Sequence, residues 1–152
     1  MDKTWTPARI FMTASAVFHV PVGVAGLFYE LAFPIGSGAA AAGPHPHVFG
    51  VFETNGWHTL GAVFVAGVSL YYALRPRHAR AGALALGLGH VGLFVSLVLW
   101  DPSTFRIASN AADQVAHAST AIFGTMAGLL TARPEPDVSA AGPPPRARPR
   151  TL

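Results

Sequence analysis

Hydrophobic residues fill four long segments of the chain that contain very few charged side chains. The segments cover about residues 10–30, 53–74, 81–100 and 110–131. Each is close to the ~20 residues that a tilted helix needs to cross the hydrocarbon core of a bilayer. Helices of a soluble bundle would instead carry a charged stripe on the face turned to water. The pattern predicts an all-α fold, an integral membrane four-helix bundle in residues 1–132.

The composition supports this prediction and separates a tail from the bundle. Of the 152 residues, 51% are hydrophobic and 11% are charged, whereas roughly 25% charged residues is usual for a soluble protein. Residues 133–152 are rich in Pro and Arg and too poor in apolar residues to build a core. We expect them to form a disordered cytoplasmic tail.

Basic residues predict how the four helices are oriented. One side of the predicted bundle holds Lys3, Arg9, Arg75, Arg77, Arg80, Arg133, Arg146, Arg148 and Arg150, and only Arg106 lies on the other. Loops on the cytoplasmic side of membrane proteins carry an excess of Lys and Arg. Both termini are therefore expected in the cytoplasm, in a multi-pass protein of the cell membrane. The same segregation indicates the lipid bilayer, and not nucleic acid, as the partner of the basic residues.

Polar side chains within the predicted spans are the main candidates for a functional site, because a polar group inside a membrane is costly. Five of them open the second and fourth spans: Asn55, His58, Asn110, Asp113 and His117. Offsets of three, four and seven residues place them on one face of each helix, where small residues continue the same stripe. They predict a buried Asn/His/Asp cluster in the outer half of the bundle.

Four further polar residues are secondary candidates, and they form an internal echo. His19 precedes Glu30 by eleven residues, and His90 precedes Asp101 by the same interval. Eleven residues are close to a whole number of helical turns, so each pair lies on one helix face. In both halves the next span begins with an Asn. The recurrence is consistent with a duplicated two-helix hairpin, and chance agreement at four positions is the alternative.

The predicted cluster is compatible with several kinds of chemistry. Imidazoles and a carboxylate, here His58, Asp113 and His117, are common ligands of zinc, iron or copper. Facing histidines can hold a haem, and a chain of His and Asp can carry protons. Hydrogen bonds across helix contacts, with Asn110 as a helix N-cap, would give the same residues a purely structural role. The spacing of the residues does not choose between these roles.

Other features of the sequence favour a role without catalysis. The chain has no cysteine, which excludes disulfides, thiolate metal sites and c-type haem attachment. It has no nucleophile–base arrangement and no glycine loop in the context that phosphate binding needs. We expect a non-enzymatic membrane protein whose cluster organises packing, with ion binding as a further role. The alternatives are a haem- or metal-dependent redox protein and a proton or small-solute transport subunit that works as a homo-oligomer.

Two stretches of the sequence resemble a known family. They are FGVFETNGWHTLGAVFVAG, which a basic turn follows, and NAADQVAHASTAIFG. They are similar to the domain-of-unknown-function 4383 family of small bacterial membrane proteins, with a match over about residues 9–131. The resemblance implies four helices and a membrane location, and no activity. Members usually have Asn and His where this chain has Thr59 and Ala62, so it also implies that one histidine of the second span is missing here.

Overall fold

The structure is a computed structural model that describes residues 5–33, 35, 44–99 and 107–133, and only the backbone of 97–99. Most of these residues belong to the helices α1 (Pro7–Tyr29), α2 (Gly56–Ala73), α3 (Ala79–Leu99) and α4 (Ala111–Leu130). A short antiparallel hairpin, β1 (His47–Val48) with β2 (Phe52–Glu53), precedes α2, and the 3-10 turn η2 (Pro76–His78) joins α2 to α3. The prediction of a four-helix, mainly α fold is confirmed. The predicted tail lies outside the described residues, apart from Arg133.

Capping residues explain where the helices begin. Thr6 caps α1 by accepting a hydrogen bond from Arg9 N, and Pro7 takes the first helical position, where its missing N–H has no partner to lose. Asn55 and Asn110 cap α2 and α4 with their side chains. α1 therefore starts at Pro7, before the predicted boundary at about residue 10, and α2 starts at Gly56, after the predicted boundary at about residue 53. The capping residues decide both boundaries.

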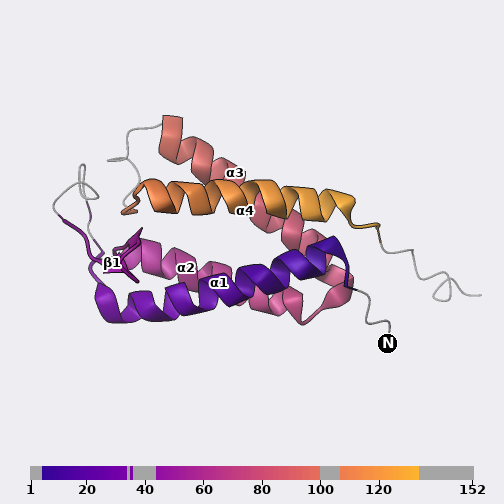
Figure 1. The fold of residues 1–152 in the computed structure, drawn as a ribbon, viewed down its shortest axis with the longest axis horizontal. Coiled ribbons are helices and arrows are strands. Elements are labelled where there is room, and N and C mark those ends of the chain that lie inside the picture. The colour runs from indigo at the N-terminus through magenta and orange to yellow at the C-terminus, as the bar shows by residue number, and fades with distance from the viewer. Residues whose placement is uncertain (1–4, 34, 36–43, 100–106, 134–152) are drawn as a thin grey trace, which may run out of the picture.

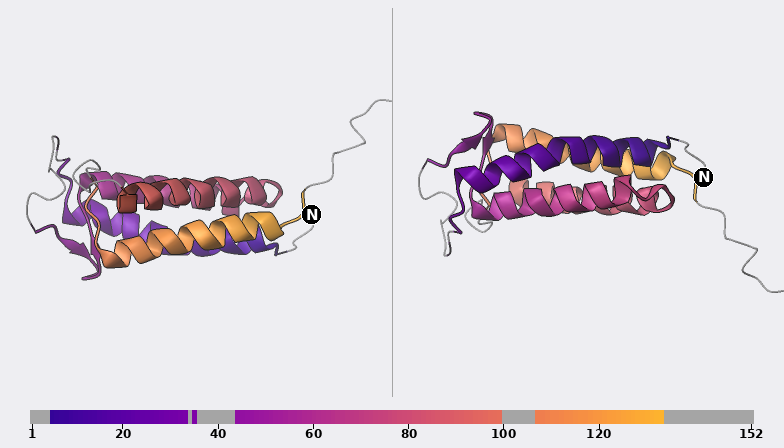
Figure 2. Two further views of the ribbon diagram at one scale, coloured as in Figure 1. Left: turned by 90° about the horizontal axis from the view of Figure 1, so that it is seen from above. Right: turned by 90° about the horizontal axis from the view of Figure 1, so that it is seen from below.

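The helices form two antiparallel hairpins, α1 with α2 and α3 with α4, which lie side by side (Figures 1 and 2). Contacts are dense within each hairpin and sparse between the hairpins. Glycines permit the close approach within each one. A Cβ on Gly23 would lie 3.1 Å from Val63 N, and a Cβ on Gly124 would lie 2.9 Å from Gly87 Cα. The duplication of a two-helix hairpin that the internal echo suggests stays a prediction.

The two ends of the bundle differ in composition. Figure 1 shows η2, the start of α1 and the end of α4 together at one end, which we name the inner end, and the β-hairpin at the other, the outer end. Near the inner end an apolar core consists of Ala8, Met12, Ala79, Ala83 and Leu86. Thr131 connects the end of α4 to α1 and α3 at this end of the bundle. Its Oγ1 accepts a hydrogen bond from Ala8 N at 2.9 Å, and its carbonyl oxygen accepts one from Arg80 Nε at 3.0 Å.

The outer surface of the helices is largely apolar. Within the described residues, two segments, Pro7–Tyr29 and Pro76–Ser96, are long and apolar enough to cross a membrane by length and composition. Val17, Phe28 and Phe64 are 70%, 83% and 69% exposed. Soluble monomers seldom expose so many large apolar side chains in continuous patches. These features agree with the membrane prediction for α1 and α3, whereas α2 and α4 are shorter or more polar.

Candidate functional site

The two asparagines of the predicted cluster are helix caps. Asn55 Oδ1 accepts a hydrogen bond from His58 N at 3.0 Å, and the residue is 0% exposed. Asn110 Oδ1 accepts from Asp113 N at 3.1 Å, while its Nδ2 donates to Val51 O at 2.8 Å. Both side chains thus satisfy backbone groups at a helix start and fix the turn that follows. The N-cap expected at Asn110 is present, and Asn55 has the same role.

Asp113 connects three elements at the outer end. Its Oδ2 accepts from Asn110 N at 2.9 Å, which completes a capping box, and from Glu53 N in β2 at 3.2 Å. Its Oδ1 lies 3.7 Å from His58 Nε2, so the two form an ion pair when the imidazole is protonated. His58 Nδ1 in turn contacts Glu53 O at 2.6 Å. With 2% of its surface exposed, Asp113 is a buried carboxylate with a partner on each side.

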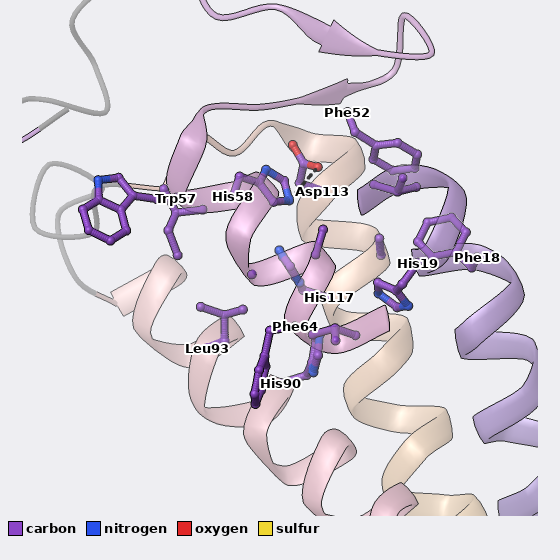
Figure 3. A pocket seen from close by; sticks show the side chains of 16 residues that line it. Phe18, His19, Phe52, Trp57, His58, Phe64, His90, Leu93, Asp113 and His117 are labelled. Carbon is purple, nitrogen blue, oxygen red and sulfur yellow. Dashed lines mark ion pairs between the residues drawn. The ribbon is translucent and has the colours of Figure 1, made fainter. Parts of the chain in front are cut away.

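Four histidines from the four helices lie in one row. The ring centroids of His58 and His117 are 5.9 Å apart, those of His117 and His90 are 5.5 Å apart, and those of His90 and His19 are 6.3 Å apart. Figure 3 shows the four side chains around a common space, with His58 and its partner Asp113 at the top of the view and His19, His90 and His117 below. The sequence predicts His58 and His117 as part of the main cluster and His19 and His90 as secondary candidates. The structure brings all four into one group.

Three of these rings form a hydrogen bond to a backbone carbonyl oxygen through the same nitrogen, Nδ1. His19 Nδ1 lies 2.9 Å from Ser15 O, and His90 Nδ1 lies 2.8 Å from Leu86 O, each one helical turn back. His58 Nδ1 has Glu53 O as the corresponding partner. A carbonyl oxygen can only accept, so Nδ1 carries the proton in each ring. In a neutral imidazole, Nε2 is then the nitrogen with the free lone pair.

His117, in the middle of the row, has an unsatisfied nitrogen. Its Nε2 is buried and has no hydrogen-bond partner among the described residues. Nearly all buried polar atoms in folded proteins are satisfied, so such an atom calls for an explanation, and an unrecorded water or ion is a common one. The imidazole rings of His58 and His90 lie on either side of it.

These side chains line a pocket of about 150 Å³ between the two hairpins. Its polar lining consists of His19, His58, His90, Asp113 and His117, and its apolar walls include Phe18, Phe52, Trp57, Phe64 and Leu93 (Figure 3). Drug-sized ligands usually occupy pockets of roughly 300–1,000 Å³. This pocket therefore suits an ion with a few waters, or a very small solute.

A second, more open groove of about 730 Å³ runs between α1 and α4. Phe18, His19 and Phe52 belong to the walls of both spaces. The lining of the groove is almost entirely apolar, and its polar groups are the hydroxyls of Ser15, Ser119 and Thr120 together with His19. The chemistry of the site is thus confined to the smaller pocket.

Two of the secondary candidates do not join the site. Glu30 is the C-cap residue that follows α1, and its Oε2 lies 3.5 Å from His45 Nδ1. The sequence does not predict this ion pair at the outer end. Asp101 lies outside the described residues. Within the part of the chain that the structure describes, no three His, Asp or Glu side chains are already arranged to hold a metal ion. The four imidazoles are neighbours, and the shortest separation of ring centroids is that of His90 and His117.

Comparison with protein families gives one match, to the family described as "Domain of unknown function (DUF4383)", over residues 9–130. The match covers most of the chain. The protein belongs to this family. The DUF4383 match includes residues of all four helices and every described residue that lines the pocket. No curated protein and no solved structure matches the chain.

The DUF4383 assignment confirms the family that the sequence resembles, and its description assigns no activity. Function must therefore be argued from the site itself. The observations to explain are a row of four imidazoles, a buried carboxylate with its partners, and an unsatisfied Nε2 in a small pocket.

Proposed function

We propose that this protein is a four-span integral membrane protein, with both termini in the cytoplasm, that binds a small cation in the pocket of its outer half. The protein binds the ion without catalysing a reaction. The observation that carries the proposal is the position of the polar groups. His58, Asp113 and His117 lie toward the outer end, His19 and His90 lie near the middle of their helices, and the inner end is closed by apolar side chains.

The distribution of charge supports both the orientation and the sign of the ligand. Glu30, Glu53 and Asp113 lie at the outer end. In the sequence, the segment between α3 and α4 adds Asp101 and the single Arg or Lys residue of this side, Arg106. Nine of the ten Lys and Arg residues belong to the inner end and the tail. An excess of negative charge around a concave site raises the local concentration of cations. The excess of positive charge at the inner end favours the cytoplasm for that side.

The packing below the pocket favours binding over conduction. From His19 the described hydrogen bonds lead to Ser15, whose Oγ lies 3.1 Å from His19 Nδ1, and on to Ser69, whose Oγ lies 2.8 Å from Ser15 Oγ. Met12, Ala83 and Leu86 follow, and they are buried apolar residues. A proton or ion pathway needs polar groups or water along its whole length. A site that opens at one end and is closed by a dry core at the other suits an ion that binds and leaves on the same side.

The volume of the pocket supports an ion over the haem alternative. At about 150 Å³ the pocket is below the range of sites for drug-sized ligands. Phe18, Phe52 and Phe64 also occupy the space around the imidazoles that a porphyrin would need. A redox role with a bare metal ion remains compatible with the pocket, and it would use the same cation site.

Single-cysteine labelling tests the orientation, and the absence of native cysteine makes it clean. In intact cells, a membrane-impermeant maleimide should label His47→Cys in β1 at the outer end. It should label His78→Cys in η2 only after the cells are permeabilised. The reverse pattern, or labelling of both from outside, would show that the proposed topology is wrong.

A second labelling experiment tests access to the pocket. Ala62 lines the pocket, and a small cationic thiosulfonate added from outside should modify Ala62→Cys. The matched control is Ala83→Cys in the inner core, which should stay unmodified. Proteoliposomes that carry the protein should conduct protons no faster than protein-free liposomes. An unreactive Ala62→Cys or a proton flux would contradict the proposed binding pocket.

A further inference from the structure

We infer that the cation is a divalent transition-metal ion of the Zn²⁺ class, held by Nε2 of His90 and His117 and completed by His19. This inference rests on the proposed function, which supplies a pocket that a cation can reach. It names a set of ligands from α1, α3 and α4, whereas the sequence places the candidate ligands at His58, Asp113 and His117. The difference follows from which nitrogen and oxygen atoms are already engaged.

The donor atoms are prepared for metal binding. Histidines that bind metals usually donate their other ring N–H to a carbonyl or carboxylate, which fixes the tautomer and the ring orientation. His19 and His90 do this with Ser15 O and Leu86 O. His117 adds a buried Nε2 that has no partner among the described residues. Neutral imidazoles of this kind suit zinc, copper, iron and nickel, and alkaline-earth cations prefer oxygen.

The spacing of the rings fits an ion between His90 and His117. Zn²⁺ bound by two Nε2 atoms at about 2 Å in tetrahedral geometry holds the ring centroids about 5 Å apart. The observed separation is 5.5 Å for this pair and 6.3 Å for His19 and His90. Two ligands are therefore almost in place, and His19 needs to move inward by about 1 Å to complete a set of three. This agrees with the absence of a ready three-ligand group among the described residues.

His58 and Asp113 are positioning residues for this site. Asp113 Oδ2 accepts two backbone N–H groups, and its Oδ1 faces His58 Nε2 at 3.7 Å. When the imidazole is protonated, His58 Nε2 pairs with Oδ1, so this nitrogen is directed at Asp113 and not at an ion between His90 and His117. Asp113 still provides the one carboxylate in the pocket lining, which partly compensates the charge of a bound cation.

Isothermal titration of the purified full-length protein in nanodiscs with Zn²⁺ tests the inference. We expect one ion per chain, and a loss of affinity of at least about tenfold in His90→Asn and in His117→Asn. Asn retains a donor near the position of Nδ1 and lacks the deeper Nε2, so His90→Asn keeps the contact with Leu86 O. The control is His78→Asn in the exposed turn η2, which should bind Zn²⁺ like the unchanged protein.

A second measurement keeps the test valid if a histidine variant fails to fold. With all histidines present, Zn²⁺ should slow the modification of Ala62→Cys at least about fivefold, because the ion occupies the same pocket. Equal Zn²⁺ affinity in all variants, or a loss confined to His45→Asn and His47→Asn, would overturn the metal assignment. If Ala62→Cys reacts from outside, and Zn²⁺ neither binds to the protein nor slows this reaction, the accessible pocket is supported and the metal assignment is wrong. If Ala62→Cys is unreactive, the proposed function itself is wrong.

Discussion

His90 of α3 and His117 of α4 lie with their ring centroids 5.5 Å apart in a pocket between two helical hairpins. The two residues belong to the same hairpin, in which a glycine contact brings the helices close together. Gly87 is one turn below His90, and its backbone touches that of Gly124. The spacing of the two imidazoles is therefore set by the glycine contact beneath them, which links the packing of the hairpin to the geometry of the site.

Gly87→Ala tests this link. A Cβ at this position would overlap the backbone of Gly124 and Thr125, so α3 and α4 must separate. We expect the free energy of unfolding to fall by about 1–3 kcal/mol. Gly89→Ala on the same helix is the control, since a Cβ there has no atom within 4 Å, and its higher helix propensity should leave stability equal or slightly raised. Thermal unfolding in detergent measures both, and equal stability of the two variants would contradict the close contact.

Asp113→Asn tests the network at the outer end. The change removes the negative charge opposite His58 and weakens the two hydrogen bonds from backbone N–H groups. Loss of a buried charged acceptor costs about 1–3 kcal/mol, so the melting temperature should fall by several degrees. Glu30→Gln alters a single ion pair, with His45, and the Glu30 side chain is 26% exposed against 2% for Asp113, so this variant should lose less stability than Asp113→Asn. If Glu30→Gln has the larger effect, Asp113 is not the main connection.

The hydrophobic pattern predicts four helices and their approximate bounds, because long apolar segments leave few alternatives to a helix. The stripes of small residues also predict the buried faces, and Ala62, Ser69, Ala121 and Gly124 are buried. The sequence does not predict the β-hairpin, because strands of two residues each are too short to show an alternation of apolar and polar residues. Phe49 and Gly50, both with positive φ, form its turn, and positive φ is uncommon for a residue such as Phe.

The site is only partly visible in the sequence. The spacing along one helix identifies Asp113 and His117 as neighbours on a face, because a helix fixes that relation. It carries no information on how far one helix is shifted along another. That shift, set by the packing of side chains, decides that His90 lies beside His117 and that His58 is held by Asp113. The separation into a metal-binding group and a positioning pair therefore needed the structure.

Thr131→Val tests the closure at the inner end. The substitution keeps the size of the side chain and removes the oxygen that accepts from Ala8 N. A buried backbone N–H without a partner costs about 1–3 kcal/mol. Thr131→Ser keeps the hydroxyl and should remain close to the unchanged protein in thermal unfolding. If the inner end opens in Thr131→Val, Ala83→Cys should also become reactive from the cytoplasmic side, and unchanged stability and reactivity would show that the contact is dispensable.

Ala62→His should strengthen the metal site, and this expectation separates the metal assignment from a purely structural role. Ala62 lines the pocket from α2, opposite the helices that carry His90 and His117. A fourth imidazole there can complete a tetrahedral set, so the affinity for Zn²⁺ should rise by about tenfold or more. Gly67→His is the control on the same helix, at a position with open space around a Cβ, and should leave the affinity unchanged. A structural network predicts the opposite for Ala62→His, namely lower stability from an extra buried polar group with no gain in Zn²⁺ binding.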